Sequence, residues 1–147
     1  MATQRSASVT WNGGLLDGSG VIHTSTSGAL GSLPVSWPAR SQEPDGKTSP
    51  EELIAAAHAA CFSMALSNVL AEGGTPPEEL AVNATVTFVP GTGITTSMLD
   101  VEGRVPGVDA ETFLVKAQDA KANCPVSQAL KGLEITLAVT SFEPAVA

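Results

Sequence analysis

Basic residues are scarce in this chain of 147 residues, where seven lysines and arginines stand against fifteen aspartates and glutamates and give a formal net charge of −8. This balance favours solubility and disfavours nucleic acid or an anionic membrane as a partner, because both carry negative charge. The N-terminus lacks the apolar segment of a secretion signal. We therefore expect a cytoplasmic protein, and the length suits a single domain over residues 1–147.

Cysteine is also scarce, with Cys61 and Cys124 as the two in the sequence. Their wide separation excludes a CxxC motif and the usual spacing of a zinc site. A structural disulfide is disfavoured in a reducing cytosol. Two interpretations remain, a pair of buried, inert thiols or a reversible catalytic pair, and cysteine usage alone favours the first.

Charged residues are missing altogether from Leu53 to Ala71. This run follows a strong helix start, with Ser49 as the cap, Pro50 at the first helical position and Glu52 placed to complete a capping box. A helix without a polar face should be buried nearly all round, by a second subunit or by the chain's own later sheet. The length would allow a membrane span, but the many alanines, the internal polar residues and the acidic flanks argue against one.

The remaining segments predict strands and two further helices. The predicted strands cover residues 6–12, 18–26, 33–37, 80–90, 94–105 and 133–142, and the predicted helices after the long one cover 110–122 and 126–130. Residues 40–48 form a predicted polar loop, and the tail from Glu143 is expected to be loosely held. The order β-β-β-α-β-β-α-α-β, with strands in hairpin runs, indicates an α+β fold with mainly antiparallel sheets.

A thiol in the middle of a helix, such as Cys61, needs a cation from elsewhere to become a thiolate. Arg40 is a candidate, because a guanidinium can lower the pKa of a thiol and donate two hydrogen bonds to a peroxide, with Lys47 as the alternative cation. Glu51 precedes Cys61 by ten residues, which is about 15 Å along a helix axis. Glu51 and Cys61 therefore cannot share a site within one chain. A solvated arginine and an ordinary glutamate at a helix start are the alternative interpretations.

His58 lies three residues before Cys61 on the predicted helix. A Cys–His nucleophile pair is conceivable, and so is a zinc site made by His58 with both cysteines. We favour a third interpretation, a buried histidine whose ring nitrogens are both hydrogen bonded. Cys124 precedes Pro125 at a predicted helix boundary.

Two long segments resemble the motifs of a known family. Ser-Pro-Glu-Glu-Leu-Ile-Ala-Ala-Ala-His-Ala-Ala-Cys-Phe-Ser-Met-Ala-Leu (49–66) resembles the central-helix motif of the OsmC/Ohr family, the osmotically inducible and organic hydroperoxide resistance proteins. Asn-Cys-Pro-Val-Ser-Gln-Ala-Leu (123–130) resembles its second cysteine motif. The early Trp-Asn-Gly-Gly and the Pro-Gly-Val-Asp turn at 106–109 are similar as well. The segments around both cysteines resemble the OsmC branch more than the Ohr branch.

This resemblance implies an OsmC-like fold, with sheets wrapped around the long helix of an intertwined homodimer, and a thiol-dependent peroxidase with no metal or bound organic cofactor. Cys61 matches the peroxidatic cysteine and Cys124 the resolving cysteine that closes a disulfide with it. Arg40 matches the arginine before the helix and Glu51 the glutamate that orients it, both serving the cysteines of the partner subunit.

The substrates implied are organic hydroperoxides, hydrogen peroxide or both, and the reductant is an external dithiol of the lipoyl type. A non-enzymatic redox sensor or small-molecule binder of the same fold is the alternative function.

Overall fold

The computed structural model describes residues 1–144, and the end of the predicted tail, residues 145–147, lies outside them. Glu143, where the tail is predicted to begin, is the last residue of a strand. The chain divides into two compact units, Met1–Leu53 and Ile54–Ala147, which are described in turn. The single domain over the whole chain stays a prediction.

The elements follow the predicted order with one addition. They are β1 (Ala7–Asn12), β2 (Ser19–Ser25), β3 (Leu33–Val35), α1 (Trp37–Ser41), α2 (Pro50–Glu72), β4 (Glu79–Val89), β5 (Gly93–Arg104), α3 (Ala110–Asn123), α4 (Pro125–Ala129) and β6 (Glu134–Glu143). The predicted α+β class is confirmed.

The added element, α1, replaces the end of the predicted third strand and the start of the predicted loop. Its cap explains why the chain turns into a helix here, because the Ser36 hydroxyl accepts a hydrogen bond from the Ala39 N–H at 3.2 Å. Pro38 lies in the first turn, where a missing N–H costs nothing. Arg40 therefore lies in the last turn of a short helix and not in a loop.

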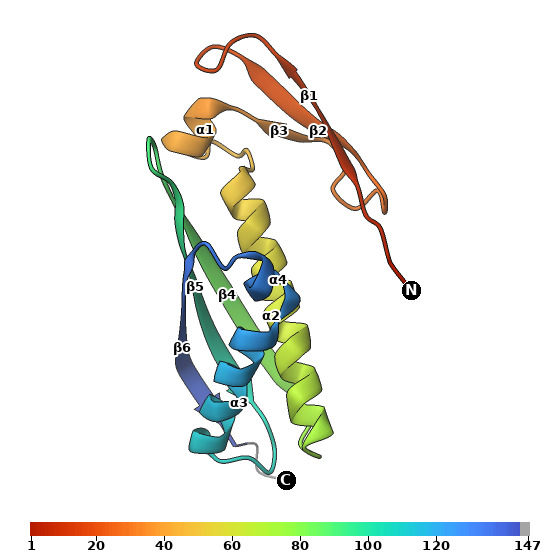
Figure 1. Ribbon diagram of the computed structural model, residues 1–147, viewed down its shortest axis with the longest axis vertical. Helices are drawn as coiled ribbons and strands as arrows, with labels where there is room; N and C mark the ends of the chain where they lie inside the picture. The colour runs from red at the N-terminus through yellow and green to blue at the C-terminus, as the bar shows by residue number, and fades with distance from the viewer. Residues whose placement is uncertain (145–147) are drawn as a thin grey trace. The chain divides into compact units, whose positions relative to one another are not determined.

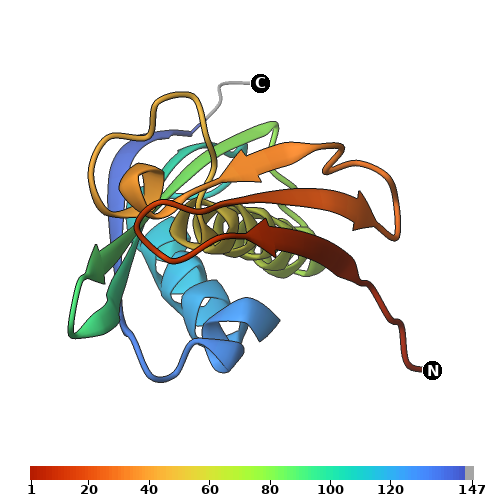
Figure 2. The same ribbon diagram turned by 90° about the horizontal axis from the view of Figure 1, so that it is seen from above.

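In the first unit, β1, β2 and β3 form an antiparallel sheet in that order, and Figure 2 shows the three strands running next to one another. This unit buries few apolar side chains, Ile22 and Ala39 among them. Val9 and Trp11 on β1 remain 56% and 40% exposed. The first unit thus presents apolar surface that the described chain does not cover.

In the second unit, β4, β5 and β6 form a sheet in that order, with β4 antiparallel to β5 and β6 parallel to β5. The parallel pair arises because α3 and α4 lie between β5 and β6 in sequence and carry the chain back to the same end of the sheet. In Figure 1, α2, α3 and α4 lie on one side of this sheet.

The core of the second unit lies between these helices and the sheet. Its fully buried aliphatic and aromatic members come from α2, β5 and α3 and include Phe62, Leu66, Leu70, Leu99, Val101, Phe113 and Ala117. The Phe113 ring stacks on Phe142 with centroids 4.6 Å apart. The same ring occupies the space that a side chain at position 103 would need, which explains the glycine there.

The described chain buries α2 along one side only. Its buried residues His58, Phe62, Leu66 and Leu70 recur every fourth position and form one stripe. On other sides of the helix, Met64 is 72% exposed. Enclosure by the chain's own later sheet is therefore wrong, because that sheet and α3 cover one stripe only.

Candidate active site

Cys61 and Cys124 meet in the second unit. Cys61 lies midway along α2 and is partly buried, whereas Cys124 is fully buried at the junction where α3 ends and α4 begins. Neither cysteine is in a disulfide, and the two side chains lie close enough that Cys124 raises the pKa of the Cys61 thiol. The structure thus brings together two cysteines that are far apart in the sequence.

The surroundings of Cys61 favour the neutral thiol. Burial raises the pKa of the Cys61 thiol, the neighbouring Cys124 raises that pKa further, and the backbone N–H of Val126 lowers it. Within the described part of the chain, no cation contributes to this balance. A nearby positive charge would lower this pKa and make Cys61 a more ready nucleophile.

Arg40 and Glu51 form a bidentate ion pair in the first unit. The Arg40 Nη2 donates to Glu51 Oε1 at 2.8 Å, and Nε donates to Oε1 at 3.0 Å and to Oε2 at 3.2 Å. Glu51 is 7% exposed at the start of α2. A carboxylate that binds two donors of a planar guanidinium fixes its orientation. The alternative cation, Lys47, instead contacts the exposed Asp45 at 3.4 Å.

The helix start that carries Glu51 forms largely as predicted. The Glu52 N–H donates to the Ser49 hydroxyl at 3.1 Å, as in a capping box, while the Glu52 carboxylate accepts from Thr48 at 2.8 Å. This cap holds the first turn of α2, and so the Glu51 carboxylate, in place.

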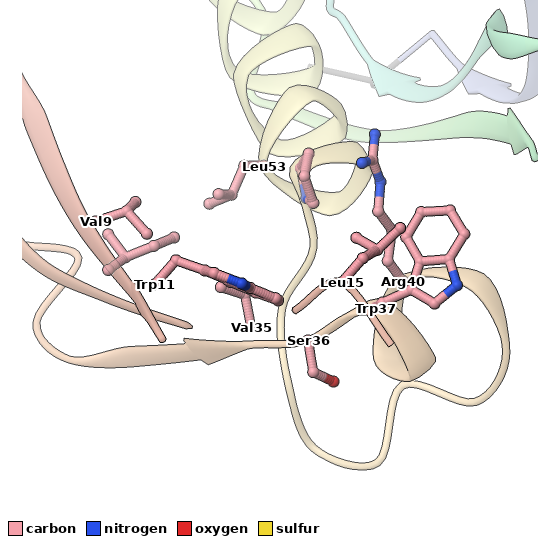
Figure 3. Close-up of a pocket in the computed structure, with 10 residues that line it drawn as sticks. Val9, Trp11, Leu15, Val35, Ser36, Trp37, Arg40 and Leu53 are labelled. Carbon is pink, nitrogen blue, oxygen red and sulfur yellow. The ribbon is translucent and has the colours of Figure 1, made fainter. Parts of the chain in front are cut away.

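Arg40 also lines an apolar hollow of about 320 Å³ within the first unit. The wall consists of side chains from β1, the segment that follows it, β2, β3, α1 and its cap, and the first turn of α2. Beside Arg40 it includes Val9, Trp11, Leu15, Ile22, Val35, Ser36, Trp37, Pro50 and Leu53. Figure 3 shows Arg40, Leu15 and Trp37 together on one side of it. A guanidinium at the edge of an apolar wall can bind the polar end of a ligand whose other end is hydrocarbon.

His58 is confirmed as a buried histidine whose ring is fully hydrogen bonded. Its Nδ1 lies 2.7 Å from the Ser97 hydroxyl and its Nε2 lies 2.8 Å from the Ser127 hydroxyl. Burial lowers the pKa of His58, so the ring is neutral near pH 7. Among residues 1–144 no group of three His, Cys, Asp or Glu side chains is arranged to hold a metal ion, and both ring nitrogens of His58 already contact hydroxyls.

The four predicted site residues therefore form two pairs, Cys61 with Cys124 in one unit and Arg40 with Glu51 in the other. Sequence reasoning missed the two serines that bind His58 and the tryptophans of the hollow. Ser127 had one available signal, its place in the Cys-Pro-Val-Ser-Gln segment.

Comparison with known proteins decides the family. The family described as OsmC-like protein matches residues 43–138. The peroxiredoxin OsmC of Escherichia coli K12 is 45% identical over 140 residues, covering 93% of this chain and 96% of the relative, and the peroxiredoxin OsmC of Shigella flexneri matches equally well. The chain belongs to the OsmC family.

Solved structures share the fold of this chain. The organic hydroperoxide resistance protein OhrB of Bacillus subtilis superimposes with a TM-score of 0.70 at 26% identity, over 94% of this chain and 98% of OhrB. An OsmC-like protein from Mycoplasma pneumoniae, at 16% identity, shares the fold with a TM-score of 0.72, over 97% and 99% of the two chains. The predicted OsmC-like fold and the predicted class of enzyme, a thiol-dependent peroxidase, are confirmed.

This membership also decides how to interpret α2. Among the described residues, α2 is the one helix that is long and apolar enough to cross a membrane, with a mean hydropathy of 1.7. Length and composition are shared by the core helices of soluble proteins. In a chain with this fold, whose α2 buries the hydrogen-bonded His58, α2 is the core helix of a soluble protein.

Proposed function

We propose that this OsmC-family protein reduces hydroperoxides at Cys61 and resolves the oxidised cysteine with Cys124. The observation that carries the proposal is the proximity of these two thiols in the second unit, close enough for each to influence the other. Two thiols this close can pass from dithiol to disulfide with little movement of the backbone.

The chemistry has three steps. The Cys61 thiolate attacks the outer oxygen of the peroxide, the O–O bond breaks, and Cys61 becomes a sulfenic acid while an alcohol, or water, leaves. The Cys124 sulfur then attacks the Cys61 sulfur, an S–S bond forms and the S–O bond breaks, and the hydroxyl leaves as water with the proton that the Cys124 thiol gives up. An external dithiol reduces this disulfide by two exchanges and is itself oxidised to a disulfide.

Activation of Cys61 is assigned to Arg40 of a second copy of the chain. Burial and Cys124 keep the pKa of Cys61 high, and the pair of Arg40 with Glu51 supplies an oriented cation that can stabilise a thiolate and the departing oxygen. Because ten residues of helix separate Glu51 from Cys61, the cation is supplied in trans.

A homodimer would also cover apolar surface that the chain leaves open. Met64 on α2 and Val9 and Trp11 on β1 are all exposed in the described chain. Large exposed apolar areas of this kind mark protein interfaces. A second copy seated on them would enclose α2, as its charge-free sequence demands.

The substrate range is proposed to include organic hydroperoxides, with or without hydrogen peroxide, because the apolar hollow beside Arg40 suits a hydrocarbon tail. The reductant is proposed to be a dithiol of the lipoyl type, and the location is proposed to be the cytoplasm, where thiols return to the reduced state.

Peroxide consumption with dithiothreitol as reductant tests the proposal. Wild type should consume cumene hydroperoxide catalytically, and Cys61→Ser should not, whereas Ser63→Ala, also on α2, should retain the activity. Equal rates for wild type and Cys61→Ser would contradict the peroxidase. Formation of one disulfide without further turnover would favour a redox sensor instead.

A further inference from the structure

The proposed mechanism does not use the hydrogen-bonded network around His58. His58 is fully buried on α2, between fully buried Ser97 of β5 and nearly buried Ser127 of α4, all within the second unit. A polar ring in such a core costs free energy unless both nitrogens are bonded. The two bonds, at 2.7 and 2.8 Å, satisfy the ring and tie three elements together.

The bond between His58 and Ser127 joins two residues that each lie three positions from one of the reacting cysteines. His58 precedes Cys61 by three residues on α2, and Ser127 follows Cys124 by three residues. Residues three apart on a helix are neighbours on its surface. Two neighbouring pairs of residues therefore bring α2 and α4 together. His58 is hydrogen bonded to Ser127, and Cys61 lies beside Cys124. The bond to Ser97 links His58 to the sheet instead.

We propose that His58 is a positioning residue for the resolving step, holding α4 through Ser127 so that the Cys124 sulfur stays within reach of the Cys61 sulfenic acid. This inference rests on the proposed peroxidase function. In the step itself the S–S bond forms, the S–O bond breaks and water leaves, as above. His58 exchanges no proton in it, and its contribution is geometric.

The protonation state of His58 fits this role. Burial lowers the pKa of His58, so near pH 7 the ring carries one donor nitrogen and one acceptor nitrogen. A hydroxyl can either donate or accept, so two serines satisfy such a ring in either tautomer. A neutral ring also leaves the task of activating Cys61 to another group.

The two serines supply a matched pair of variants. Ser127→Ala and Ser97→Ala each remove one hydroxyl from the same ring and leave one ring nitrogen unpaired, but Ser127 alone belongs to the helix that follows Cys124. Reduced protein is mixed with one equivalent of cumene hydroperoxide and quenched at intervals. Mass spectrometry then follows the Cys61 sulfenic acid, trapped with dimedone, and the Cys61–Cys124 disulfide.

We expect sulfenic acid to form at the wild-type rate in both variants. Disulfide formation should be about five- to tenfold slower in Ser127→Ala, the effect of one lost hydrogen bond, and within about twofold of wild type in Ser97→Ala. With excess peroxide, Ser127→Ala should also accumulate more Cys61 sulfinic acid, because the sulfenic acid survives longer.

Equal slowing in both variants would assign the network to general packing and overturn the inference, as would a wild-type disulfide rate in Ser127→Ala. Should Ser127→Ala not fold, His58→Asn breaks the same link from α2 and should slow disulfide formation equally, and a wild-type rate there would overturn the inference too. Absence of sulfenic acid from wild type would instead be a failure of the peroxidase proposal, so the two failures are distinguishable.

Discussion

The Arg40 guanidinium binds the Glu51 carboxylate through both Nη2 and Nε, at 2.8 and 3.0 Å from the same oxygen. This pair fixes the orientation of a cation that the proposed mechanism needs at Cys61. Arg40→Ala should therefore lower the peroxidase rate constant by about a hundredfold, the usual cost of removing a donor that stabilises developing negative charge. Lys47→Ala is the matched control, and steady-state assays should find it close to wild type.

Mixing two inactive variants tests whether Arg40 acts in trans. In a dimer of one Cys61→Ser chain with one Arg40→Ala chain, one of the two sites would combine an intact Cys61 with an intact Arg40. Unfolding and refolding an equal mixture should then restore about a quarter of the wild-type activity, since half of the dimers are mixed. An inactive mixture that contains mixed dimers would show that each chain uses its own Arg40.

The pH dependence of Cys61 alkylation offers a second test of the same cation. Burial and Cys124 raise the pKa of Cys61 within the second unit. The proposed Arg40 cation would lower this pKa, so its removal should leave the pKa high. The midpoint of the iodoacetamide rate against pH should lie higher in Arg40→Ala than in wild type, because the thiolate is the reacting form. An unchanged midpoint would separate Arg40 from the activation of Cys61.

Much of this arrangement was readable from the sequence, for physical reasons that particular residues make clear. Ser49, Pro50 and the charge-free run define α2, and the predicted helix over 110–122 forms as α3, capped by the Asp109 carboxylate, which accepts from the Thr112 N–H at 2.7 Å. Local hydrogen bonds and periodicity decide these features, and both are visible over a few residues.

Other features depend on contacts that sequence patterns do not specify. Helix α1 was hidden because Pro38 fits a strand end as well as a first helical turn. The partners of His58 come from β5 and α4, far along the chain, and serines are too common to identify as partners. The cover of α2 was undecided in the sequence because composition shows that a helix needs cover without showing which chain provides it.

Stability should depend on pH through His58. Burial lowers the pKa of His58 in the folded state, so the unfolded chain binds a proton more readily. Stability should be fully present above the ordinary histidine pKa of about 6.5 and should fall as the pH drops below it. Urea unfolding at a series of pH values should find a smaller dependence in His58→Asn.

A side chain at position 103 should destabilise the protein. A Cβ at this position would lie 2.5 Å from Cζ of Phe113, whose ring is fully buried. Gly103→Ala should lower the free energy of unfolding by about 1–3 kcal/mol, as overpacking does. Gly132→Ala is the matched control, because nothing lies within 4 Å of a Cβ there. A Gly103→Ala protein as stable as wild type would show that the ring moves aside at no cost.

The most direct measurement is a single turnover without reductant. Fully reduced protein is mixed with one equivalent of cumene hydroperoxide, and the alcohol formed and the intact mass of each chain are determined together. We expect one alcohol and one disulfide per chain, with peptide mapping joining Cys61 to Cys124, and neither product from Cys61→Ser. Alcohol produced at the same rate by Cys61→Ser, or a disulfide that joins other positions, would contradict it.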